Sequence, residues 1–137
     1  MNDPRLSSES LADAALAAYE NVLGATPGFR PRAGQHAMAA CVADTLARAD
    51  LGEHATPTKA IAVIQAGTGV GKSAAYASTA IALALARKTR VVISTATVAL
   101  QEQLMAKDLP ALAATLALVD VLNRLAPRRA PLPRSWR

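Results

Sequence analysis

The sequence has one cysteine, few aromatic residues and no long apolar run. The single Cys41 excludes an internal disulfide and is typical of a reducing compartment. No apolar run reaches the roughly 18 residues that a membrane span needs, and the start at Met1–Arg5 lacks the pattern of a secretory signal peptide. The sequence therefore predicts a cytoplasmic protein that does not enter a membrane.

Aromatic residues make up only 3% of the 137 residues, although apolar residues as a whole make up 52%. Alanine accounts for about a quarter of the chain, so a core would be built from small side chains that each bury little area. A chain of this length can bury one core. We therefore expect one domain, or a part of one, with modest stability.

Acidic residues are absent after position 120, and this locates the net charge of +5. Residues 1–120 hold ten Lys/Arg and ten Asp/Glu, which cancel. The excess comes from five arginines: Arg124, Arg128, Arg129, Arg134 and Arg137. Residues 127–137 also contain three prolines and show no periodicity, which predicts a disordered tail. A basic charge usually indicates a nucleic-acid partner, but here it says nothing about the surface of the folded part.

One stretch carries recognisable chemistry: Ala66-Gly67-Thr68-Gly69-Val70-Gly71-Lys72-Ser73. Glycines let a backbone turn with its N–H groups directed inward around a phosphate. Lys72 supplies a mobile cation for the β- and γ-phosphates of ATP, and the Ser73 hydroxyl is placed to ligate Mg²⁺. The alternative is a glycine-rich connection that merely joins two elements. The pattern predicts an ATP phosphate site in which Lys72 and Ser73 carry the chemistry.

Hydrophobic spacing predicts the elements around this stretch. We expect helices over the first 24 residues, over about 34–48 and over 71–87, and strands at 60–65 and 91–95. A strand, a helix and a strand in this order form a βαβ unit with parallel strands, so the predicted fold class is α/β. Two more helices are expected to follow, at 98–105 and 110–126.

The second helix has an apolar stripe, because Met38, Val42 and Leu46 recur at a spacing of four. This stripe predicts its buried face. Cys41 on the adjacent flank is expected to be a small buried or half-buried filler. In the next helix, 71–87, Leu85 is expected on the inner side.

Upstream of the glycine-rich stretch, Phe29, Arg32, Gln35 and Met38 stand at a strict spacing of three. This pattern is compatible with an ordinary helix entry that has an aromatic, a surface arginine, a solvated glutamine and a core methionine. In the functional interpretation Gln35 reads adenine, because a carboxamide can accept from the exocyclic amine and donate to a ring nitrogen in one plane.

The second predicted strand ends in hydroxyl-bearing residues, among them Thr95 and Thr97. Hydroxyls where a strand meets a helix can hold a nucleic-acid phosphate. They can equally cap the helix that follows. In that helix Leu100 and Leu104 are four apart and are expected to face the core, whereas Gln101 and Gln103 are expected to be exposed.

Three linked stretches, FRPRAGQHAM, AGTGVGKS and VVISTATVALQEQLMAKDLPAL, together resemble the opening of a DinG-type DNA helicase, an XPD-like member of superfamily 2. The resemblance covers roughly residues 25–112 and implies a partial RecA-like domain. It assigns Arg32 and Gln35 to the adenine site and Ala66–Ser73 to the phosphates of ATP with Mg²⁺. It also assigns Thr95, Thr97 and Gln101 to single-stranded DNA. The implied activity is ATP-driven 5′ to 3′ unwinding of DNA in repair or replication.

The same resemblance implies parts that the chain lacks. The family continues into an iron–sulfur insertion with four cysteines, an Asp-Glu-x-His motif and a second RecA-like domain, none of which is present. We therefore expect a truncated chain: an N-terminal helix at 1–24, a partial ATP-binding domain at 25–126 and the tail at 127–137. Hydrolysis of ATP also needs an acid for Mg²⁺, a water-orienting group and an arginine from another domain. We expect no useful hydrolysis or unwinding by this chain alone. The alternatives are a binding module for ATP or nucleic acid without catalysis, and an unrelated P-loop kinase.

Overall fold

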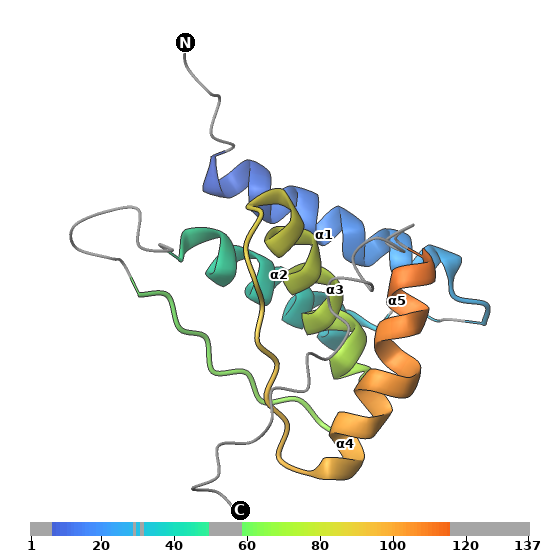
Figure 1. The fold of residues 1–137 in the computed structure, drawn as a ribbon. Helices are drawn as coiled ribbons and strands as arrows, with labels where there is room; N and C mark the ends of the chain where they lie inside the picture. Colours follow the sequence, from blue (N-terminus) through green and yellow to red (C-terminus); the bar gives the residue numbers. More distant parts are fainter. Residues whose placement is uncertain (1–6, 29, 31, 50–58, 116–137) are drawn as a thin grey trace, which may run out of the picture.

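The computed structural model describes residues 7–28, 30, 32–49 and 59–115, and over these residues it is helical (Figure 1). The helices in chain order are α1 Ser8–Ala25, α2 Ala33–Arg48, α3 Lys72–Ala86, α4 Val98–Gln103, the π-helix η1 Leu104–Asp108 and α5 Leu109–Thr115. Some of the residues discussed above lie outside the described part: Phe29, residues 116–126 of the last predicted helix and the tail at 127–137. No helix in the described part is long and apolar enough to cross a membrane.

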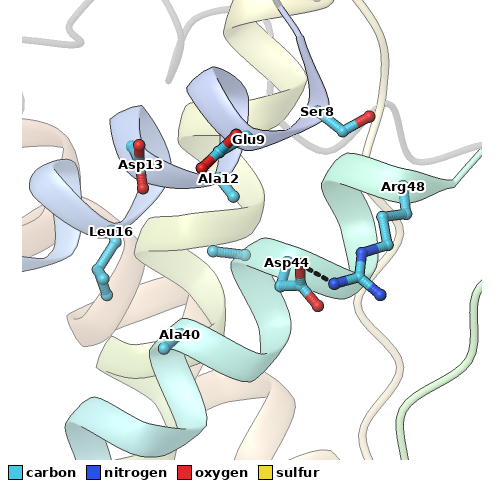
Figure 2. A pocket seen from close by; sticks show the side chains of 9 residues that line it. Ser8, Glu9, Ala12, Asp13, Leu16, Ala40, Asp44 and Arg48 are labelled. Carbon is cyan, nitrogen blue, oxygen red and sulfur yellow. Dashed lines mark ion pairs between the residues drawn. The ribbon is translucent and has the colours of Figure 1, made fainter.

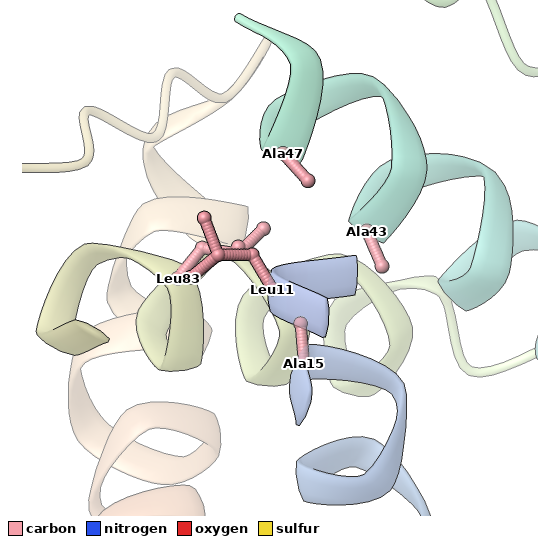
Figure 3. Packing of buried hydrophobic residues seen from close by; sticks show 5 residues of the cluster. All are labelled: Leu11, Ala15, Ala43, Ala47 and Leu83. Carbon is pink, nitrogen blue, oxygen red and sulfur yellow. The ribbon is translucent and has the colours of Figure 1, made fainter. Parts of the chain in front are cut away.

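The core lies where α1, α2 and α3 pack against one another. One cluster takes its side chains from all three helices: Leu11, Ala15, Ala43, Ala47 and Leu83 (Figure 3). A second cluster, Val22, Ala77, Ile81 and Leu112, joins α5 to α1 and α3. Alanine side chains let helix backbones approach closely, which explains how a chain so poor in aromatic residues buries a core.

The predicted α/β fold is wrong for the part of the chain that the structure describes, which contains no strand. The segments 60–65 and 91–95 are extended, but neither is paired in a sheet. Ile61, Val63 and Val92 are 82%, 96% and 92% exposed, although the apolar runs predicted strands covered on both faces. A parallel strand needs a paired neighbour and helices on its faces. In the described residues the helices bury their alanine faces against each other and leave the two apolar runs exposed, and no βαβ unit or RecA-like sheet is present there.

The buried face of α2 also differs from the prediction. The buried residues of α2 are Gln35, Ala39, Ala43 and Ala47. The predicted stripe of larger side chains lies one residue earlier and is only half-buried. The small residues allow α2 to lie close to α1 and α3, and this outweighs the greater apolar area of the longer side chains. As a result Cys41 is exposed rather than buried or half-buried.

Two further expectations about packing are wrong for the same reason. Leu85 in α3 is 38% exposed, because that helix buries its alanine and hydroxyl residues against α1 and α2. Leu100 of α4 is 48% exposed, whereas Leu104 of η1 is buried as predicted. Gln101 and Gln103 are exposed, in agreement with the prediction.

The two helices predicted at 98–105 and 110–126 form one continuous helical segment up to Thr115, with η1 in the middle. The segment widens into the π-helix directly before Pro110. Proline has no N–H to continue an α-helical hydrogen-bond ladder, and its ring crowds the preceding turn. A wider turn accommodates it without ending the helix.

Arg87, the residue just after α3, forms hydrogen bonds that link this helix to the end of α2. Its guanidinium donates hydrogen bonds to the carbonyl oxygens of Leu46 and Ala49, each at 3.0 Å, and of Ala47. The last carbonyls of a helix have no partner within the helix, and a cation there also interacts favourably with the helix dipole.

We expect the Arg87→Met variant to lose about 1.5–3 kcal/mol of unfolding free energy, because three carbonyls lose a charged donor. Urea denaturation monitored by circular dichroism measures this loss. Arg90 is exposed, and the Arg90→Met variant should stay within about 0.5 kcal/mol of the wild type. Equal losses in the two variants would show that Arg87 does not fasten the helices.

Candidate functional site

The glycine-rich stretch forms the connection between the extended segment 60–65 and the N-terminus of α3. Gly69 and Gly71 have φ values of +76° and +82°, in the left-handed region that favours glycine. Gly71 is the N-cap of α3 and contributes no side-chain cap, so the first N–H groups of a 15-residue helix are left for another acceptor. Such a helix start, with its partial positive charge, favours an anion.

The Lys72 side chain lies across this loop. Its ammonium donates to the carbonyl oxygens of Ala66 at 2.8 Å and Gly67 at 3.1 Å. One full positive charge is therefore held against the loop, next to the partial charge of the helix start. Both features attract a polyphosphate, and the lysine can exchange two neutral acceptors for charged ones.

Gln35 reaches the same loop from α2. Its Nε2 donates to the carbonyl oxygen of Gly71 at 2.8 Å, and its Oε1 accepts from the Tyr19 hydroxyl at 3.2 Å. The side chain is only 1% exposed. The structure therefore places Gln35, the predicted adenine reader, against the glycine-rich loop, with both ends of its amide engaged by protein.

Tyr19 is a residue that sequence reasoning missed. Burial, and to a smaller extent the neighbouring Glu20 carboxylate, raises the pKa of Tyr19 above its usual value of 10.0, so its hydroxyl keeps its proton at neutral pH. The available signal was its position four residues after Ala15, on the otherwise apolar stripe of the first helix. A hydroxyl on such a stripe needs a buried partner.

Ser73, the predicted Mg²⁺ ligand, and Thr95 line one cavity of about 200 Å³ between α3 and the α4–η1 segment. The remaining lining residues are Tyr76, Ser94, Ala96, Leu100, Gln103, Leu104 and Asp108. The Ser73 hydroxyl and the Asp108 carboxylate give this cavity the oxygen donors that Mg²⁺ prefers. The donor chemistry is that of a Mg²⁺ site to which a bound polyphosphate would have to add ligands, because the described residues hold no group of three potential metal ligands.

Two of the predicted nucleic-acid residues, Thr95 and Thr97, make hydrogen bonds within the chain. Thr97 is the N-cap of α4 and accepts from the backbone N–H of Leu100 at 3.2 Å, while Thr95 donates to the Thr97 carbonyl at 3.1 Å. Gln101 is exposed and is not among the residues that line the cavity. Arg32 is exposed at the N-cap position of α2, where its carbonyl accepts from the N–H groups of Gln35 and His36.

A larger cavity, of about 530 Å³, opens between α1 and α2 and contains none of the predicted site residues (Figure 2). Glu9, Asp13 and Asp44 line it, and the nearby Arg48 is paired with Asp44 at 2.7 Å. Carboxylates repel a polyphosphate, so this cavity is unsuited to ATP. The described residues hold no group of three potential metal ligands there or elsewhere.

Comparison with known proteins finds similarity to bacterial helicases. The chain is 47% identical over 102 residues, 74% of its length, to the ATP-dependent helicase DinG of Mycobacterium tuberculosis strain H37Rv. It is 47% identical over 92 residues, 67% of its length, to the ATP-dependent DNA helicase DinG of Photobacterium profundum. It is 44% identical over 94 residues, 69% of its length, to that of Salmonella typhimurium strain LT2.

These alignments span only 12–13% of the relatives' own length. No family model matches the chain. No solved structure matches it either.

Proposed function

Because the chain is DinG-like over 67–74% of its length, we propose that it provides the ATP phosphate site of a DinG-type DNA helicase. The observation that carries this proposal is that the Lys72 ammonium lies against a loop with left-handed glycines that leads into the N-terminus of α3. The alignment supports a relationship to DinG helicases, and the geometry of the loop supports phosphate binding.

The proposed binding step uses groups that the structure brings together. The backbone N–H groups of Gly67–Gly71, which include those of Thr68 and Val70, surround the β-phosphate, and small Ala66 permits the turn. Lys72 moves its ammonium from the carbonyls of Ala66 and Gly67 to the β- and γ-phosphates. Ser73 would hold Mg²⁺, which supplies charge neutralisation for the phosphates when bound.

Beyond phosphate binding, we propose that unwinding belongs to a longer protein. The relatives bear the name helicase over a length that the chain covers to 12–13%. Turnover of ATP needs a water-orienting group and an arginine from a second domain, which the assigned residues do not include. For the longer helicase we propose 5′ to 3′ movement on single-stranded DNA, with Thr95, Thr97 and Gln101 along the strand. The chain alone should bind ATP without useful hydrolysis.

Comparison of nucleotides that differ in phosphate number tests the proposal. Mg·ATP and Mg·ADP should bind the purified chain, and AMP should bind about 10- to 100-fold more weakly, because it lacks the phosphates that Lys72 and the loop contact. Isothermal titration calorimetry measures the three affinities. Equal affinity for AMP and ATP would contradict a phosphate site.

A further inference from the structure

The Gln35 amide joins α1 to the phosphate loop through two hydrogen bonds of opposite direction. It accepts from Tyr19 at 3.2 Å and donates to the Gly71 carbonyl at 2.8 Å. The second contact is close: a Cβ added to Gly71 would lie 2.2 Å from the Gln35 Nε2. The loop can therefore approach the amide this closely only because residue 71 has no side chain.

Tyr19 of α1 is buried against side chains of α2 and α3. It is 0% exposed and packs with Ala39 of α2 and Ala75 of α3. The His36 ring meets the Tyr19 ring edge-on, with centroids 6.1 Å apart. Side chains from three helices thus fix the position of one hydroxyl.

The Gly71 carbonyl can only accept, so the end of the Gln35 amide that faces the loop must be the Nε2 donor. Oε1 is then left to accept the proton of the Tyr19 hydroxyl, a group that can itself donate or accept. The reverse orientation would bring Oε1 against the Gly71 carbonyl, two acceptors without a proton between them. A buried amide in that state would lose its hydrogen bond to the loop.

We propose that Tyr19 is a positioning residue of the ATP phosphate site, acting through Gln35 on Gly71. The inference rests on the proposed phosphate site and extends it to α1, which holds none of the residues expected to contact ATP. Gln35 then serves as an anchor of the loop. Through this contact its effect falls on the phosphates of any nucleotide.

The test uses the Tyr19→Phe variant, which removes the hydroxyl and keeps the buried ring. Mg·ATP, Mg·GTP and inorganic magnesium tripolyphosphate are titrated against the full chain. We expect all three affinities to fall together, by about 3- to 10-fold, because one hydrogen bond that orders the loop is lost. Thr45→Val is the matched control, since it removes a hydroxyl bond to the Cys41 carbonyl at 2.7 Å on α2 and should leave all three affinities unchanged.

Two outcomes would overturn the inference. Unchanged affinities in Tyr19→Phe would show that the hydroxyl does not act on the loop. A loss confined to ATP would show that Gln35 acts on adenine instead.

A measurement without ligand separates this inference from the proposed function. In the nuclear magnetic resonance spectrum of the ligand-free chain, Tyr19→Phe should shift the amide signals of Gly71 and Lys72, and Thr45→Val should not. If the wild type binds none of the three ligands but these shifts occur, the phosphate site fails while the coupling of Tyr19 to the loop stands. If the shifts do not occur, the coupling itself fails.

Discussion

Replacing Lys72 by alanine should lower the affinity of the chain for Mg·ATP by about 10- to 100-fold. A hydrogen bond from a charged donor contributes about 1.5–3 kcal/mol, and every 1.4 kcal/mol changes affinity about tenfold. Within the described residues the Lys72 ammonium contacts two neutral carbonyls, at 2.8 and 3.1 Å, and charged phosphate oxygens are stronger partners than these. Isothermal titration calorimetry of the variant and the wild type measures the loss.

Charge alone could weaken ATP binding to any variant that lacks a lysine. Lys59→Ala is the matched control, because Lys59 is exposed and its loss changes the net charge by the same amount. It should change the affinity for ATP by less than about twofold, since solvent screens an exposed charge. Equal losses in the two variants would show that the Lys72 ammonium does not contact the phosphates.

Replacing Gly71 by alanine should disturb both the fold and the ATP site. The φ of +82° costs a residue with a Cβ about 1–3 kcal/mol. The added methyl group would also lie 2.2 Å from the Gln35 Nε2 and push the amide from the Gly71 carbonyl. An unpaired buried donor costs about another 1–3 kcal/mol. We therefore expect a loss of at least about 2 kcal/mol in urea denaturation, and at least about tenfold weaker ATP binding.

Gly67→Ala is the matched control in the same loop. No atom lies within 4 Å of the position that its Cβ would take, and its φ is not in the left-handed region. Its stability should stay within about 0.5 kcal/mol of the wild type. If Gly71→Ala were as stable as Gly67→Ala, the close contact with Gln35 would not exist in solution.

The positions of α1, α2 and α3 could be predicted from local signals. Ser7 caps α1 by accepting from the Ser10 N–H at 3.2 Å. Such signals act over a few residues, so the sequence displays them directly.

Faces and partners could not be predicted in this way. The apolar runs at 60–65 and 91–95 indicated strands, but a strand forms only with a neighbour to pair with, and short apolar runs do not reveal one. The prediction of the buried face of α2 was wrong, because alanines give a weaker hydrophobic signal than Met38 or Leu46 although they are the residues that pack closely. The link from Tyr19 through Gln35 to Gly71 joins three separate segments, and no local spacing records it.

We propose that the loop from Gly67 to Ser73 binds the phosphates of ATP. Amide hydrogen exchange is the most direct test, because it locates the bound ATP along the chain. The experiment compares exchange rates of the chain with Mg·ATP, with AMP and without ligand. Mg·ATP should slow amide exchange in a peptide covering residues 67–73, and AMP at the same concentration should not. Slowed exchange at the acidic cavity between α1 and α2, with no change at residues 67–73, would contradict the proposal.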